Sequence, residues 1–174
     1  LAMGAAVASS YLPISGGSSN NVVAALGGDQ QTNAADSEIR YETLGSAPDR
    51  VFVVQWKNFR HYGAAGDSYN YQIRLHETSN LVEVVYGAFA QNATARTAEV
   101  GLRGASNADF NNRSGTGAWT ASTAGGANTA TMALTSTAVP PTGLTWAWSP
   151  LAPHPTFDSS SKTAPAQVVM GDPI

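Results

Sequence analysis

Hydrophobic and polar residues alternate along the stretch YNYQIRLHETSNLVEVVYGAF, residues 69–89. The alternation stops at ETSN and then resumes, which is typical of two antiparallel strands joined by a four-residue connection. This connection places His76 opposite Leu81 and Arg74 opposite Glu83, so we expect an ion pair between Arg74 and Glu83 on the polar face. A shift of one residue would mix the two faces, so the pattern specifies the register well. The apolar face of this predicted hairpin consists of Tyr71, Ile73, Leu75, Val82, Val84 and Tyr86.

A second hairpin is predicted where IRYET and RVFVVQW flank LGSAPD, because Pro48 and Asp49 favour a turn. Pairing Thr43 with Arg50 defines its register. One face then carries Ile39, Tyr41, Phe52, Val54 and Trp56. The run VFVV is apolar at every position, which predicts a central strand that is covered on both sides.

Other short segments are rich in β-branched and aromatic residues and are separated by Gly, Asn and Ser, and no segment shows a sustained helical period. The chain therefore predicts an all-β fold, an antiparallel β-sandwich of the jelly-roll-like kind. The expected strands cover residues 22–26, 39–43, 51–59, 69–76, 81–86, 98–103, 129–135 and 144–148.

The composition narrows the class of protein. A length of 174 residues fits one domain. Charged residues make up 12% of the chain, the net charge is −3, and the only lysines are Lys57 and Lys162, so no basic cluster suits a nucleic acid. No apolar run is long enough to span a membrane. The chain has no cysteine, which excludes disulfides and thiolate chemistry.

The last part of the chain differs from the rest. Five of the nine prolines fall within residues 150–174. We therefore predict a β-sandwich module over residues 1–149, followed by an extended proline-rich arm over residues 150–174 that docks on its own module or on a neighbour. The arm contains a segment that could serve as a donated strand in a partner, Ala166, Gln167, Val168, Val169 and Met170.

The sequence gives little sign of catalysis. The histidines at 61, 76 and 154 show no metal-ligand spacing, and no GxSxG nucleophile motif is present. Glu99 shares a strand face with Arg103, and Glu83 faces Arg74, as on a solvated sheet surface. We therefore expect a protein that is not an enzyme, with a polysaccharide hydrolase that uses two facing carboxylates as the third alternative.

Two loops are rich in oxygen ligands. GGDQQTNAADSE carries Asp29, Asp36 and Glu38, and ASNADFNN carries Asn107 and Asp109. Calcium takes six to eight oxygen ligands, often from such loops. No cofactor is required by the sequence, and calcium at these residues is an alternative, since Asn and Asp are also ordinary turn residues.

Exposed aromatic residues could stack on sugars. Trp146 and Trp148 share one strand face with Leu144 and are expected in the core. Trp119, Tyr62 and Phe59 lie in or beside predicted loops, and are therefore the candidate ligand-binding residues. A carbohydrate-binding or adhesion module is the second functional hypothesis, with glycans as partners.

Several phrases together resemble a known module. NNVVAALGGD, IRYETLGSAPDRVFVVQWKNF, YNYQIRLHETSNLVEVVYG and AEVGLRGASNADFNNR, followed by GLTWAWSP, are similar to a β-sandwich module of large secreted bacterial surface proteins. Those proteins are often type IX secretion cargo with fibronectin-type-III-like repeats. A more distant similarity is to the nidogen-type extracellular module. The resemblance covers residues 1–150 and implies an extracellular, non-catalytic building block, without catalytic residues to transfer to this chain.

The chain departs from the resemblance at its start, because Leu1 corresponds to a point partway through the module. The resemblance therefore implies absent leading strands and an open sheet edge, to be filled by another chain, by the arm or by a preceding part of the parent protein. The leading hypothesis is a structural or interaction subunit of a larger surface assembly. It would be secreted, or lie on the cell surface or periplasmic face of a bacterium, with other protein chains as partners.

Overall fold

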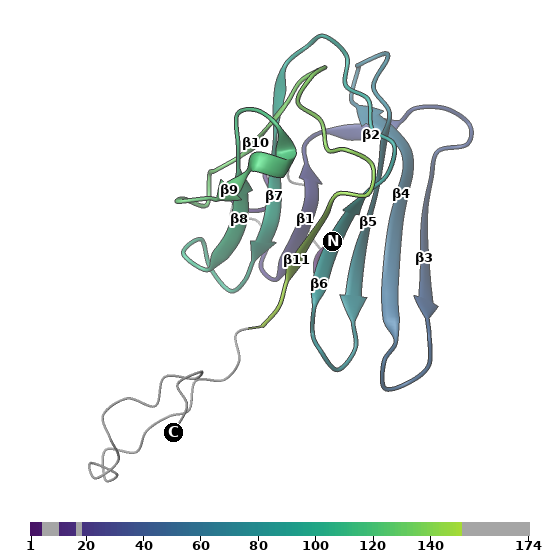
Figure 1. Ribbon diagram of the computed structural model, residues 1–174, viewed down its shortest axis with the longest axis vertical. Helices are drawn as coiled ribbons and strands as arrows, with labels where there is room; N and C mark the ends of the chain where they lie inside the picture. The colour runs from purple at the N-terminus through teal and green to yellow at the C-terminus, as the bar shows by residue number, and fades with distance from the viewer. Residues whose placement is uncertain (5–10, 17–18, 151–174) are drawn as a thin grey trace.

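The computed structural model describes residues 1–4, 11–16 and 19–150, which form two antiparallel β-sheets packed against each other (Figure 1). The predicted β-sandwich is therefore confirmed. The first sheet contains β1 (Val22–Gly27), β7 (Arg96–Arg103), β8 (Phe110–Ser114) and β9 (Thr123–Ala124), with β10 (Met132–Leu134) paired to β7. The second sheet contains β11 (Thr145–Trp148), β6 (Val82–Tyr86), β5 (Tyr69–His76), β4 (Val51–His61) and β2 (Gln30–Thr32), with β3 (Glu38–Leu44) paired to β4. A short 3₁₀ helix, η1, spans Trp119–Ala121.

The hydrophobic core lies between the two sheets, where the apolar face of the β5–β6 hairpin meets β1 and β7. The Tyr86 hydroxyl, buried in this core, donates a hydrogen bond to the backbone oxygen of Ala25 at 2.6 Å. This bond links the two sheets and satisfies a polar group that would otherwise be costly to bury. The expected core residues Trp148, Trp146 and Leu144 all pack in or against this cluster.

The register predicted for the β5–β6 hairpin is confirmed. Ile73 pairs with Val84 and Arg74 with Glu83, and the His76 amide donates to the Leu81 oxygen at 2.9 Å. The expected ion pair between Arg74 and Glu83 is wrong. Glu83 instead lies 2.7 Å from His76 Nε2, and Arg74 donates to the side-chain oxygen of Gln72, so each charge binds a neighbour on the same polar face.

The register predicted for the β3–β4 hairpin is wrong by two residues, because Thr43 pairs with Phe52 and not with Arg50. The turn begins only at Gly45, whose φ of +80° is a conformation that glycine adopts without strain. A shift of two residues keeps the same side chains on the same face. The predicted central position of β4 is confirmed, since Val53 and Val54, which point to opposite faces, are both buried.

The sequence missed three strands, namely β2, β8 and β9, and overestimated β10. The missed strands are short or polar, and β8 reads FNNRS. The structure also corrects the surface position expected for Glu99 and Arg103, which are 1% and 5% exposed. Their side chains hold the segment 11–16, which packs over that face of β7.

Glu99 and Arg103 bind the backbone of this segment directly. The Glu99 carboxylate accepts hydrogen bonds from the Ile14 amide at 2.7 Å, from the Ser15 amide and from the Ser15 hydroxyl. The Arg103 guanidinium donates to the Ile14 oxygen at 3.3 Å and to the Asn20 side-chain oxygen. These buried charges therefore stabilise a loop, where the sequence predicted a solvated sheet surface.

The first residues pair with the outer edge of β1. The Leu1 nitrogen donates to the Val23 oxygen at 2.9 Å, and Ala2 forms a bridge with Val22. The edge expected to be open is therefore occupied in part by the described chain. The expected arm, including Ala166, Gln167, Val168, Val169 and Met170, lies outside the described residues, apart from Pro150. In the described part of the chain, no helix is long and apolar enough to cross a membrane.

Candidate functional site

The inner face of the second sheet is covered at one end and open at the other. A single cross-strand row shows the change, since Tyr41 pairs with Val54, Val54 with Ile73 and Ile73 with Val84. Exposure along this row rises from 0% for Val84 and 1% for Ile73 to 8% for Val54 and 76% for Tyr41. The first sheet therefore covers β5 and β6 but leaves β3 bare, at the outer edge of the molecule (Figure 1).

Other apolar side chains of β3 share this exposure. Ile39, on the same face as Tyr41, is 55% exposed, and Leu44, at the end of the opposite face, is 48% exposed. The Tyr41 ring lies 6.0 Å from the ring of Phe52 on β4. Scattered apolar residues on a surface are normal, but a cluster on an edge strand is typical of a contact site. We call the unpaired side of β3, with Ile39, Tyr41 and Thr43, the β3 edge.

The backbone of the β3 edge has free hydrogen-bonding groups. The Glu77 amide donates to the Arg50 oxygen at 2.8 Å, so the even-numbered residues at this end of β4 bond to β5 and the odd-numbered ones bond to β3. In β3 the partners of the odd-numbered residues are Arg40, Glu42 and Leu44. The N–H and C=O groups of Ile39, Tyr41 and Thr43 therefore point outward, and no strand among the described residues pairs with them.

The outer face of β3 is charged. It carries Glu38, Arg40 and Glu42, and the Arg40 guanidinium lies 2.7 Å from Glu38 with 73% of its side chain exposed. Lys57 lies 3.7 Å from Glu38. Glu42 forms no ion pair within the described residues. The β3 edge thus has apolar side chains on one face and both signs of charge on the other.

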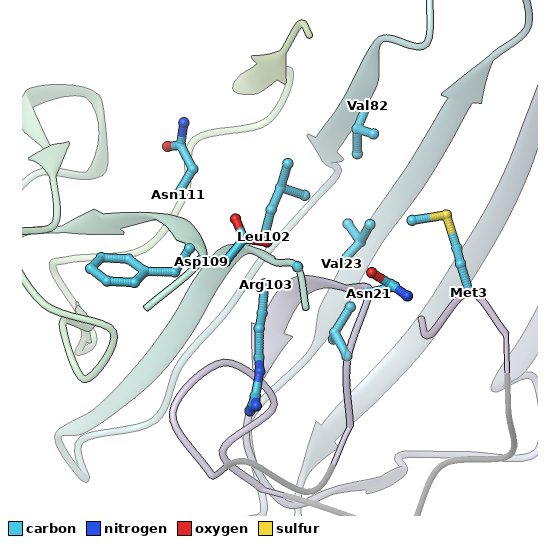
Figure 2. A pocket seen from close by; sticks show the side chains of 11 residues that line it. Met3, Asn21, Val23, Val82, Leu102, Arg103, Asp109 and Asn111 are labelled. Atoms are coloured by element: carbon cyan, nitrogen blue, oxygen red, sulfur yellow. The ribbon is translucent and has the colours of Figure 1, made fainter. Parts of the chain in front are cut away.

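A pocket of about 540 Å³ lies where the two sheets separate. Figure 2 shows Val23, Leu102 and Val82 around it, with Met3 on one side and Asn111 on the other. These apolar side chains come from β1, β7 and β6, so both sheets contribute to the wall. The pocket is concave and largely apolar, as small-molecule sites are.

Two polar side chains of this pocket are used by the protein itself. Asn111 Oδ1 accepts a hydrogen bond from the Trp148 indole at 3.0 Å, and Asp109 Oδ2 accepts one from the Ala105 amide at 2.9 Å. Arg103 extends away from Val82 and toward the segment 11–16 (Figure 2). A ligand would find few free polar partners here, so the pocket supports a specific binding site less well than the β3 edge does.

The three aromatic residues considered for sugar contact differ in exposure. Tyr62 is 64% exposed, as expected, and Phe59 packs at the margin of the core. The exposure expected for Trp119 is wrong, because this side chain is 1% exposed. Its indole lies in the core and donates to the Ala133 oxygen at 2.8 Å.

The oxygen-rich residues considered for calcium make contacts within the fold. Asp36 lies 3.8 Å from Lys57 and accepts a hydrogen bond from the Asn58 side chain. The Asp29 backbone oxygen accepts a hydrogen bond from Tyr62. Within the residues that the structure describes, no three His, Asp or Glu side chains form a group that could hold a metal. The remaining candidates, Glu38, Asn107 and Asp109, occupy strand β3 and an exposed turn before β8.

The buried acids are also engaged. Asp67, 1% exposed, accepts hydrogen bonds from the Tyr69 hydroxyl at 2.8 Å and the Asn92 amide at 2.7 Å, and Arg96 lies 3.8 Å away. Burial and the neighbouring Asp67 raise the pKa of Tyr69. This network joins the loops before β5 and β7 and has the character of a structural support.

Sequence reasoning did not identify the β3 edge as a site. The apolar pattern of Ile39 and Tyr41 matched that of a core-facing strand. Such a pattern does not show whether the opposite sheet is wide enough to cover the strand. The one available signal was the position of β3 as the first strand of a hairpin. Such a strand can pair with the second strand of the hairpin alone and so lie at the edge of its sheet.

The comparisons with known proteins give one match. The family model described as NIDO related matches residues 1–150, which is the extent of the predicted resemblance. No curated protein and no solved structure matches the chain. Domains of this kind are typically extracellular. Since the match covers most of the sequence, the chain belongs to the NIDO-related family.

Proposed function

We propose that this extracellular domain is a non-catalytic interaction module that binds protein chains through the β3 edge. The observation that carries the proposal is Tyr41, which is 76% exposed on a strand whose outward backbone groups are unpaired among the described residues. An unpaired edge can accept a further strand by backbone hydrogen bonding, and exposed side chains then select the partner.

The state of the acidic residues supports the non-catalytic part of the proposal. Glycoside hydrolysis needs one free acid and one free carboxylate facing each other across a cleft. Glu77 is bound by Arg50 at 2.5 Å, Glu83 lies beside His76, and Glu99 is bound by backbone amides. These contacts leave the acids poorly placed for proton transfer to a substrate.

The carbohydrate-binding alternative has less support. Sugar-binding surfaces usually combine aromatic rings with polar groups, and Tyr62 is the one candidate aromatic residue that is largely exposed. Membership in type IX secretion cargo, a bacterial surface location and assistance by calcium remain predictions.

The test is photo-crosslinking with benzoylphenylalanine placed at position 41. Position 62 is the matched control, because Tyr41 and Tyr62 are both well exposed. The purified variants are illuminated alone and with the extracellular fraction of the source organism. We expect protein adducts at position 41 that exceed those at position 62, and equal yields at both positions would overturn the proposal.

A further inference from the structure

We propose that the β3 edge pairs with the β3 edge of a second copy of this chain, antiparallel, around a two-fold axis at Tyr41. This inference rests on the proposed function and names the partner. A two-fold interface uses the same surface on both subunits, so the surface must complement itself. Three properties of β3 meet this condition.

The first property is the direction of the free backbone groups. Ile39, Tyr41 and Thr43 direct their N–H and C=O groups outward, because Arg40, Glu42 and Leu44 bond to β4. With Tyr41 opposite Tyr41 of the second copy, Ile39 lies opposite Thr43. All three pairs are then of the hydrogen-bonded kind, with two backbone bonds in each.

The second property is the charge pattern, which selects this register over its neighbours. In the register centred on Tyr41, Arg40 of each copy faces Glu42 of the other, so two opposite-charge pairs form. A register centred on Arg40 would place the two Arg40 side chains against each other. A register centred on Glu42 would do the same with the two carboxylates. Like charges directly opposite destabilise a strand pair.

The third property is the availability of the side chains involved. The Arg40 guanidinium binds Glu38 of its own strand at 2.7 Å, but 73% of its side chain is exposed, so it can also reach a second carboxylate, and Glu42 forms no ion pair within the described residues. On the other face, Tyr41 would stack against Tyr41 of the second copy, and Ile39 would contact Thr43. Aromatic and β-branched cross-strand pairs of this kind stabilise antiparallel strands.

Alternative partners are less well supported. A strand from an unrelated protein could pair with the same backbone groups, but it would have to place opposite charges against both Arg40 and Glu42, which a second copy already does. The alternation of Glu38, Arg40 and Glu42 complements itself when the strand is reversed, since Arg40 then faces Glu42 in both directions. A second copy is therefore the partner that this pattern fits.

The experiment uses the full chain and two charge variants, Arg40→Glu and Glu42→Arg, in sedimentation equilibrium over a range of concentrations. Each variant alone would place like charges opposite each other twice, so we expect its dimerisation to weaken about tenfold or more relative to the unaltered chain. An equimolar mixture of the two variants restores both opposite-charge pairs. We therefore expect heterodimers at close to the original affinity.

A third variant, Thr43→Pro, removes one outward N–H group and leaves the β3–β4 bonds in place. We expect circular dichroism to show that this variant is folded, and sedimentation equilibrium to show that it dimerises more weakly than the unaltered chain. If Thr43→Pro does not fold, the mixture of the two charge variants still tests the inference, because Arg40 and Glu42 both lie at exposed positions.

The outcomes distinguish this inference from the proposed function. An unaltered chain that stays monomeric up to about 1 mM overturns pairing with a second copy. If crosslinks at position 41 then reach other extracellular proteins, the interaction module stands with a different partner. A dimer that the charge variants leave unchanged, singly and mixed, also overturns the inference, because it must use another surface or register.

Discussion

The indole ring of Trp119 stacks on that of Trp146, with ring centroids 5.4 Å apart and an angle of 9° between the planes. Tyr86 meets both rings edge-on, at 5.2 Å from Trp119 and 5.6 Å from Trp146. The stack joins the 3₁₀ helix η1 to β11, which lie far apart in the chain. It therefore anchors an otherwise irregular segment to the core of the sandwich.

Replacement of Trp119 by Ala is expected to destabilise the fold by about 3–5 kcal/mol, because it empties a large buried volume and removes the indole hydrogen bond. The control is Tyr62→Ala, which alters an exposed ring and should change the free energy of unfolding by less than about 0.5 kcal/mol. Urea denaturation measures both. Similar effects of the two changes would contradict the burial of Trp119.

The Glu99→Gln variant should loosen the segment 11–16. The neutral amide can no longer accept from the Ile14 amide, the Ser15 amide and the Ser15 hydroxyl together, and hydrogen bonds to charged groups contribute about 1.5–3 kcal/mol each. We expect a loss of about 2–3 kcal/mol in unfolding free energy. Hydrogen exchange at the Ile14 amide should become faster, whereas Glu42→Gln, on an exposed strand face, should leave it unchanged.

Gly101 lies in β7 with a φ of +141°, and a Cβ there would approach the Asn111 oxygen and the Asn112 Cα to 2.4 Å. Gly101→Ala should therefore disrupt the pairing of β7 with β8 and lower the melting temperature sharply. Gly28→Ala is the matched control, since a Cβ at Gly28 meets nothing within 4 Å. Equal melting temperatures for the two variants would contradict the close approach of the strands.

Hydrogen bonds from the Arg50 guanidinium lower the pKa of Glu77 to about 2 from its ordinary value of 4.5. Between these values the unfolded chain binds more protons than the folded chain does, so this pair stabilises the fold above pH 4.5 and its contribution is lost as the pH falls toward 2. NMR titration of the Glu77 carboxyl should show this low pKa. Arg50→Gln should return it toward the ordinary value, and because the pair is exposed, added salt should also raise it.

The sequence predicted the strands and register of the β5–β6 hairpin because one of its faces packs on the core, with Ile73 and Val84 buried and Leu75 and Val82 partly buried. The alternation of apolar and polar residues then specifies the register of the two strands, including the pairing of Ile73 with Val84. It could not predict how charges pair within a polar face. Glu83 binds His76 rather than Arg74, and several such partners lie within reach of one another on a wet surface.

The misplaced residues depend on parts of the chain that are distant in sequence. Alternation placed Glu99 and Arg103 on one face correctly, but that face is covered by a segment more than eighty positions earlier. Trp119 lies in an irregular segment and enters the core because β10 and β11 complete its surroundings. Tyr41 showed the pattern of a core residue, and its exposure depends on the width of the opposite sheet.

Alternate residues of β3 direct their backbone groups to opposite sides of the strand. Arg40, Glu42 and Leu44 hold the strand to its own molecule, while Ile39, Tyr41 and Thr43 face outward. On the pairing proposed above, a backbone change at the second set, such as Thr43→Pro, would weaken self-association with little loss of folding. The strand can therefore be kept in its own sheet by one set of residues while the other set is free to vary.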